Sequence, residues 1–448
     1  MAIKKMRLWT LGLSGAAALL LILMLLVSYA FPVLAAPRLQ GTDYPTMTPA
    51  NVEIDPVAVE EVGGNSEPVV FLGETKDGFT IGDTTVVSDY PNGATFTVTI
   101  QSEQELDQVT LVIRYPHGSG TRVQAGRGTG ENEWVATLYD TDDQPPWLRM
   151  DFFWRVIDLA GGSVETTAQN YVYSDPTRVW YHAANDQLEL YWFGWPEEFA
   201  QAVMHGMAVV QERWLLGFGE PLSFRPIAVV FSDADTFGEF SNAGAAGNSR
   251  RAGFTSNDLG ITVQRFPELG FISSCPRNPP PEDQTIEWAY DYMTEVITHE
   301  VTHLYQFDKN VGGPTWFVEG GATWFSLNSI RAGTGLRDHN PGQDILTLQG
   351  DGPGGGGNIP NGCNAPGYWM GASFIQWIYG QYGMEGIHQW FDLISRNTRM
   401  NEALIAVTGK NLAQLEPEWR AYLGYNPEPF VPPTQEYQFP PTVTPFGQ

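Results

Sequence analysis

The segment that most constrains this chain is Thr298-His299-Glu300-Val301-Thr302-His303. Residues four apart on an α-helix lie one turn apart on the same face, so His299 and His303 can direct both imidazoles at one metal ion. The carboxylate of Glu300 then projects beside that ion. The sequence therefore predicts a helix here, with a partner element that faces the two histidines.

A tightly held zinc ion needs a third protein ligand, and a fourth position left open for water. Glu319 is the best candidate for this ligand, because it lies in a second helix-competent stretch from Thr315 to Ile330. The segment 307–314, with its Gly312-Gly313-Pro314 breaker, is long enough to reverse the chain. We therefore expect a Zn²⁺ site in which Glu319 faces the histidine pair from an antiparallel helix.

The two histidines and two glutamates together indicate hydrolysis. The pKa of a zinc-bound water falls from about 15.7 to roughly 7, so a nearby carboxylate can deprotonate the water as it attacks a carbonyl. Glu300 is predicted to be this general base and later the proton donor. The same chemistry acts on any amide or ester, so a non-peptide substrate stays open.

These motifs resemble the gluzincin metallopeptidases, in particular the peptidase MA-like group, which is distantly related to the thermolysin and aminopeptidase N families. The resemblance rests on His299-Glu300-x-x-His303 and Trp316-x-x-Glu319-Gly320-x-Ala322, and covers roughly residues 170–425. It implies zinc binding by the two histidines and the downstream glutamate, and a peptide or protein substrate. Tyr368-x-x-Gly371 is similar to a segment of aminopeptidase N-like enzymes, and the resemblance implies that Tyr368 stabilises the oxyanion. The Gly-x-Met-Glu-Asn segment of those enzymes is absent, so endo- versus exopeptidase action stays open.

The balance of charge excludes one class of partner. Acidic residues outnumber lysine plus arginine by 51 to 24, which gives a formal net charge of -27. Such a surface repels phosphate backbones, so no nucleic-acid partner is expected.

Residues 1–36 are predicted to be a targeting segment. A start rich in lysine and arginine precedes the apolar run Leu11–Val27, and Ala35-Ala36 offers small residues to a signal peptidase. We therefore expect a secreted or extracytoplasmic protein. The uncharged stretch Leu8–Pro37 is long enough to span a bilayer, so an uncleaved anchor that attaches the protein to the membrane stays open.

The chain has two cysteines, Cys275 and Cys363. In an oxidising compartment we expect this pair to form a disulfide, with two buried free thiols as the alternative. A bridge would join the approach to the zinc helix to the loop before Tyr368.

The predicted fold class is α+β. After residues 1–36, a linker is expected over residues 37–65 and an antiparallel β-sandwich similar to immunoglobulin or fibronectin type III domains over residues 66–174, where short alternating strands recur. A gluzincin-type metallopeptidase domain, with a small sheet and a mostly helical second half, should occupy residues 175–426. The Pro-rich tail at residues 427–448 is expected to be disordered.

Within the metallopeptidase region, apolar residues at intervals of three and four predict that the zinc helix runs from Gln284 to about Phe307. Further helices are predicted at Gly371–Gln381, Glu385–Arg396 and Leu412–Leu423. In gluzincins an edge strand beside the zinc helix pairs with extended substrate. Leu259–Gln264 is the candidate for it, with an ordinary internal strand as the alternative.

A second class of function stays open. The protein could be a cell-surface binding protein, in which the sandwich does the work and the metallopeptidase fold is a retained scaffold. The sequence also leaves open what the sandwich binds and which oligomer forms.

Overall fold

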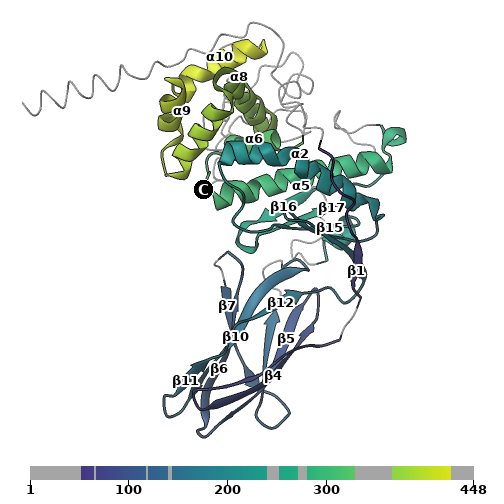
Figure 1. The fold of residues 1–448 in the computed structure, drawn as a ribbon, viewed down its shortest axis with the longest axis vertical. Coiled ribbons are helices and arrows are strands. Elements are labelled where there is room, and N and C mark those ends of the chain that lie inside the picture. The colour runs from purple at the N-terminus through teal and green to yellow at the C-terminus, as the bar shows by residue number, and fades with distance from the viewer. Residues whose placement is uncertain are drawn as a thin grey trace, which may run out of the picture. The chain divides into compact units, whose positions relative to one another are not determined.

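The computed structural model (Figure 1) describes residues 52–64, 67–117, 120–139, 144–239, 252–270, 280–327 and 366–424. Two compact units divide the chain, Met1–Thr42 and Asp43–Gln448, and every described residue belongs to the second. The predicted targeting segment, the tail and both cysteines lie outside the described residues, so the predictions about them stay predictions. Among the described residues, no helix combines the length and the apolar character needed to cross a bilayer.

Two antiparallel sheets are built from the residues between Val69 and Tyr173. The first contains β2 (Val69–Phe71), β3 (Glu74–Lys76), β4 (Phe79–Ser88), β5 (Gly93–Ser102), β8 (Gly126–Arg127) and β9 (Glu133–Tyr139). The second contains β6 (Leu106–Arg114), β7 (Gly120–Gln124), β10 (Leu148–Asp158), β11 (Ser163–Glu165) and β12 (Gln169–Tyr173). The first sheet has the order β2-β4-β5-β9-β8 with β3 also on β4, and the second has β11-β10-β6-β7 with β12 also on β10.

The alternation of residues along these strands explains how the two sheets pack. Phe96 and Ile100 of β5 are buried, whereas the threonines between them are more exposed, as expected for a strand with one face in a core. The ring of Phe96 lies 5.1 Å from that of Phe152 in β10. Trp154 Nε1 donates a hydrogen bond of 3.0 Å to Thr84 Oγ1. The sheets therefore share one core, while their similarity to immunoglobulin or fibronectin type III domains stays a prediction.

A third sheet lies beside the predicted zinc helix. It contains β1 (Glu60–Gly63), β13 (Val179–Ala184), β14 (Glu189–Trp192), β15 (Ile227–Phe231), β16 (Gly253–Ser256) and β17 (Ile261–Arg265), in the order β1-β13-β14-β15-β17-β16. β14, β15 and β17 are parallel, and the other pairs are antiparallel. All five residues of β15 are buried, which is typical of a parallel strand covered on both faces. The protein thus has mixed α and β structure, as the sequence predicts.

The prediction that Leu259–Gln264 forms a sheet edge is wrong. β17 lies between β15 and β16, so the alternative of an internal strand holds, and among the described strands β16 is the one at the edge. The physical reason is burial, because four of the five residues of β17 are buried, including Thr262 and Gln264, whereas all four residues of β16 are partly exposed. The edge beside the zinc helix is therefore Gly253–Ser256.

Seven helices belong to the described residues. They are α2 (Glu198–Phe218), α3 (Ala234–Phe237), α5 (Ile286–Asp308), α6 (Thr315–Phe325), α8 (Pro366–Ser395), α9 (Met400–Thr408) and α10 (Leu412–Leu423), with the short 3₁₀ turns η1 (Asn257–Leu259) and η2 (Pro281–Asp283). α2 and α5 lie along one face of the third sheet (Figure 1). The predicted helices before and after residue 383 are the two parts of α8, which breaks at Gly383 (φ 69°, ψ -176°).

The start of α5 and the end of α6, the two helices that carry the predicted metal ligands, each have a local cause. α5 begins two residues later than predicted, because Thr285 caps it by accepting a hydrogen bond from Trp288 N. α6 ends at Phe325, so the helix is shorter than the helix-competent stretch that begins at Thr315. At this end the guanidinium of Arg213 donates to three backbone carbonyls that the helix leaves free, at 2.8–3.3 Å.

α6 and α8 approach each other backbone to backbone. A Cβ placed on Gly371 would lie 1.7 Å from the carbonyl oxygen of Trp316, and one on Gly320 would lie 2.5 Å from the backbone of Gly371. This close approach needs glycine on both helices. It also fixes Tyr368, which lies three residues before Gly371, relative to the helix of Glu319.

A buried carboxylate joins the second antiparallel sheet to the third sheet. Glu189 of β14 is 2% exposed. Both of its oxygens lie 2.6 Å from Arg149 Nη2 of β10, and it also accepts from Arg225 and Tyr191. Burial alone would raise the pKa of Glu189, but hydrogen bonds with His182 and Tyr191 and the two arginine charges lower this pKa to about 2.

Replacing Gly371 by alanine should destabilise the protein, because the new methyl group meets backbone that cannot move aside. Overpacking of this kind costs about 1–3 kcal/mol, which lowers the midpoint of thermal unfolding by roughly 2–6 °C for a cooperative unit of about 250 residues. Gly126→Ala is the matched control, since a Cβ there has no atom within 4 Å. Equal midpoints for the two variants in a thermal melt would contradict the close approach.

Candidate metal centre

α5 and α6 form an antiparallel pair whose facing sides carry the predicted ligands. Just past the middle of α5, His299 faces Thr323 near the end of α6, with Nδ1 and Oγ1 3.5 Å apart. Near the end of α5, Gln306 bonds to Val318 near the start of α6. Because the contacts run in opposite directions along the two helices, Glu319 lies opposite the histidine pair, as the sequence predicts.

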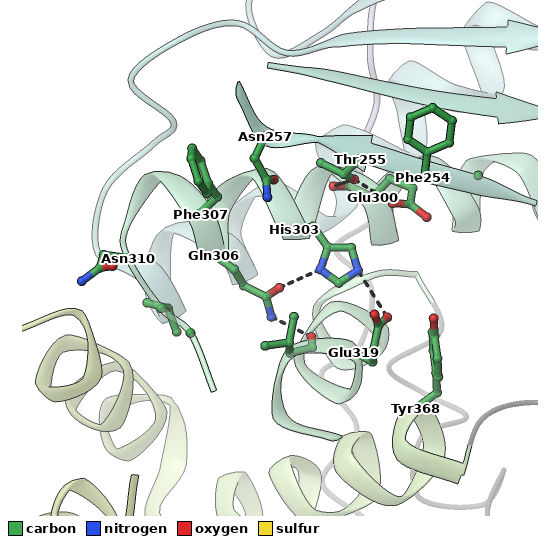
Figure 2. A pocket seen from close by; sticks show the side chains of 14 residues that line it. Phe254, Thr255, Asn257, Glu300, His303, Gln306, Phe307, Asn310, Glu319 and Tyr368 are labelled. Carbon is green, nitrogen blue, oxygen red and sulfur yellow. Dashed lines mark hydrogen bonds and ion pairs between the residues drawn. The ribbon is translucent and has the colours of Figure 1, made fainter. Parts of the chain in front are cut away.

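Three ligand-type atoms converge between these helices. The Nε2 atoms of His299 and His303 are 3.2 Å apart, and Oε2 of Glu319 lies 3.3 Å from the first and 3.4 Å from the second. Figure 2 shows His303 and Glu319 directed at each other. In a tetrahedral zinc site with bonds of about 2.0–2.1 Å, neighbouring ligand atoms lie roughly 3.3 Å apart. The three residues therefore fit a single zinc ion with little rearrangement.

Electrostatics favour a cation at this point. Burial by itself lowers the pKa of His303, but its hydrogen bond to Glu319 and the charges of Glu300 and Glu319 raise it to about 9. Burial alone would raise the pKa of Glu319, but hydrogen bonds and charge interactions with the two histidines hold it well below its usual range. Glu319 is thus ionised at neutral pH, the state in which a carboxylate binds metal.

Gln306 is a site residue that no sequence motif indicates. Its Oε1 lies 2.8 Å from His303 Nδ1, and its Nε2 donates to the carbonyl of Val318 at 2.8 Å. Because the amide nitrogen is bound to a carbonyl, the amide oxygen is the atom left to accept from His303. In the neutral form of His303, the form that binds metal, Nδ1 therefore carries the hydrogen and donates it, which leaves the Nε2 lone pair for a cation. The signal in the sequence was its position three residues after His303.

Thr255 is the second site residue that the sequence did not indicate. It lies on the edge strand β16, and its hydroxyl is 2.7 Å from Oε2 of Glu300 and 2.9 Å from the backbone oxygen of Glu300. Glu300 is 9% exposed. The strand therefore holds the predicted base beside the cluster (Figure 2).

The predicted residues lie together around one cavity. Glu300, His303, Glu319 and Tyr368 line a space of about 600 Å³, within the usual size range of ligand pockets. The ring of Tyr368 stacks on His299, with centroids 5.6 Å apart and planes 12° apart. The structure thus brings all five predicted site residues together, while their catalytic and metal-binding roles stay predictions.

The comparisons with known proteins found distant likenesses to solved structures. No protein-family model matches the chain, and no curated protein matches it. An M1 zinc metallopeptidase from Deinococcus radiodurans is similar over 84% of this chain and 94% of its own, with 11% identity and a TM-score of 0.32. An aminopeptidase N family protein from Idiomarina loihiensis is similar over 76% of this chain and 75% of its own, with 12% identity and a TM-score of 0.33. A carbohydrate-binding module family 56 β-1,3-glucan-binding domain is similar over 23% of this chain and 98% of its own, with 12% identity and a TM-score of 0.14. The first two of these structures give a distant resemblance to the M1 metallopeptidases.

Changing Gln306 to leucine should weaken zinc binding by about 10–100-fold, because loss of a ligand's outer hydrogen-bond partner has effects of that size. The affinity can be measured by competition with a fluorescent chelator at neutral pH. Gln376→Leu makes the same change at a buried glutamine on α8 that bonds to Trp324, so it should leave the affinity unchanged. Equal zinc affinity in wild type and Gln306→Leu would show that the amide does not orient His303.

Proposed function

We propose that this protein is a zinc-dependent peptidase. The observation that carries the proposal is the convergence of two imidazole nitrogens and one carboxylate oxygen, 3.2–3.4 Å apart, with a second carboxylate beside them in an open cavity. The proposal rests on this geometry, and the solved structures add a distant resemblance.

Each residue has a distinct task in the proposed reaction. A zinc ion held by His299, His303 and Glu319 would polarise a carbonyl and lower the pKa of water. Glu300 accepts the proton of the attacking water and passes it to the leaving amine. The hydroxyl of Tyr368 donates to the oxygen on which negative charge develops.

Thr255 gives Glu300 a fixed position for proton transfer. Its hydroxyl approaches Oε2 of the carboxylate, so the other oxygen of Glu300 is the one left to act on water. Because Thr255 belongs to the edge strand β16, its hydrogen bond also fixes the position of Glu300 relative to that strand.

The edge strand β16 supports a peptide as substrate. Gly253, Phe254 and Thr255 of this strand line the same cavity as Glu300 and His303. An extended chain that adds to a sheet edge gains backbone hydrogen bonds for affinity, while pockets for its side chains give selectivity. A peptide laid along β16 would pass directly beside the proposed base.

The place of action is proposed from sequence alone. The positive start and apolar run of residues 1–36 support export, with the mature protein either released or anchored in the membrane. The catalytic part would then act outside the cytoplasmic membrane.

Changing Glu300 to glutamine should abolish turnover, because the glutamine amide cannot accept the proton of the attacking water. Zinc should stay bound, because Glu300 is not one of the three proposed ligands. Loss of a general base lowers rates by roughly 10²–10⁴-fold. Elemental analysis for zinc and a mixed peptide library read by mass spectrometry test this on the same samples. Glu287→Gln, at an exposed position in the first turn of α5, is the matched control and should cleave like wild type. Full activity in Glu300→Gln would refute the mechanism, and zinc without cleavage in the wild type would favour a binding scaffold or a non-peptide substrate.

Removing the acid in Glu319→Ala should instead lose the metal, since one of three ligands is gone. We expect zinc affinity to fall by more than about 100-fold, beyond the effect of removing an outer partner. The zinc content after dialysis against a weak chelator measures it, and Val318→Ala on the same helix should keep its zinc. A full zinc complement in Glu319→Ala would mean that another residue is the third ligand.

A further inference from the structure

The third sheet shares a hydrophobic core with the antiparallel sheets that precede it. Val229 and Phe231 of β15 belong to the same cluster of buried side chains as the core of those two sheets. Val230, which lies between them in β15, belongs instead to the cluster that contains the helices. Because successive side chains of a strand point to opposite faces, the antiparallel sheets pack on the face of the third sheet that the helices leave free.

His117 extends this contact toward the metal centre. It lies three residues after β6, and its ring centroid is 3.8 Å from that of Phe224, in the segment between α2 and β15. Gly260 lies directly against the same ring, because a Cβ placed there would be 2.5 Å from Nε2 of His117. The imidazole thus packs between Phe224 and the residue at which η1 ends.

The ring of His117 acts here by packing and not by charge. Burial lowers the pKa of His117, although the charges of Asp308 at the end of α5 and of Asp258 in η1 oppose this shift. The imidazole is therefore neutral at pH 7. A planar, uncharged side chain of similar length should be able to replace it.

η1 connects the ring of His117 to the proposed base. Among the described strands, β16 pairs with β17 alone, and η1 with Gly260 is the connection between these two strands. η1 also lies against α5. Thr255, two residues before η1, donates to Oε2 of Glu300 at 2.7 Å. Movement of η1 would therefore move the hydroxyl group that holds the base.

We infer that His117 is a positioning residue for the proposed reaction, and that the antiparallel sheets contribute to the active site through it. Its ring holds Gly260 and η1 in place, and η1 fixes the end of β16. Thr255 on this strand then holds Glu300 beside the metal centre. The inference rests on the proposed peptidase function, and it makes the antiparallel sheets a requirement for catalysis instead of a separate binding module.

The first test compares two variants of His117 in the zinc-loaded full chain, with a peptide that the wild type cleaves. His117→Ala removes the ring and should lower kcat by about tenfold, since a misplacement of about 1 Å caused by a distant mutation can cost up to about 10²-fold. The zinc affinity, measured by competition with a chelator, should be unchanged. His117→Gln restores a planar, neutral group of similar length and should recover most of kcat.

Amide hydrogen exchange, read by mass spectrometry, measures the same effect without turnover. In His117→Ala, fragments that cover β16 and η1 should exchange at least about threefold faster than in the wild type, because packing that limits local opening is lost. Fragments that cover α6 should exchange at the wild-type rate. His117→Gln should restore slow exchange in β16 and η1.

A double-mutant cycle tests the route from His117 to Glu300. Thr255→Val keeps the shape of the side chain but removes the hydroxyl group, so kcat should fall. If His117 acts through Thr255, adding His117→Ala to Thr255→Val should cause little further loss of kcat. Two independent effects would instead multiply.

Control variants separate positioning from a general loss of stability. His205→Ala makes the same truncation at an exposed position on α2 and should cleave like the wild type. Val164→Ala removes buried volume from β11, so it should lower the midpoint of thermal unfolding but leave kcat and the exchange of β16 unchanged. Phe224→Leu removes the opposite ring and replaces His117→Ala in every comparison if a thermal melt shows the alanine variant to be unfolded.

The outcomes distinguish this inference from the peptidase proposal. If the wild type cleaves and His117→Ala keeps full kcat and slow exchange, the role of His117 is overturned and the peptidase proposal stands. Losses that multiply in the double variant, or an equal loss of kcat in Val164→Ala, would also overturn it. Failure of the wild type to cleave any peptide would refute the peptidase proposal. In that case faster exchange of β16 in His117→Ala would still support its hold on the strand, and unchanged exchange would overturn it.

Discussion

The hydrogen bond from the amide of Gln306 to the carbonyl of Val318 is the interaction on which the geometry of the candidate site depends. It joins α5 to α6 one residue before Glu319, and the other end of the same amide binds His303. Gly321 makes room for it, since a Cβ there would lie 2.8 Å from the amide nitrogen. One neutral side chain therefore sets both the rotation of an imidazole and the spacing of the two helices that hold the ligands.

The sequence predicted those parts of the site that depend on local geometry. The spacing of His299 and His303 on one helix follows from the helical repeat, and Gly312-Gly313-Pro314 accounts for the reversal that brings Glu319 opposite them. Gln306 and Thr255 could not be predicted in the same way. Their partners lie 12 and 45 residues away, so their roles depend on which side chains tertiary packing places opposite.

The order of strands in the third sheet could not be predicted from the sequence either. Ile261–Arg265 and Gly253–Ser256 are both short, and hydrophobic pattern does not show which of two neighbouring strands lies at the edge. Burial decides it, because Thr262 and Gln264 are covered although both are polar. The sequence analysis also did not predict α9. Arg399 is not a favoured residue at a helix start, and its side chain makes no capping hydrogen bond.

The buried carboxylate of Glu189 bears on whether the parts of this chain can be separated. A fragment that began after Tyr173 would keep Glu189 and Arg225 but lose Arg149, and it would uncover the face of Tyr191 on which Trp147 stacks at 4.7 Å. A buried charge that loses a partner is costly. The third sheet is therefore matched to the sheet that precedes it, and an unrelated module placed before residue 175 would have to supply both an arginine and an aromatic ring at the same points.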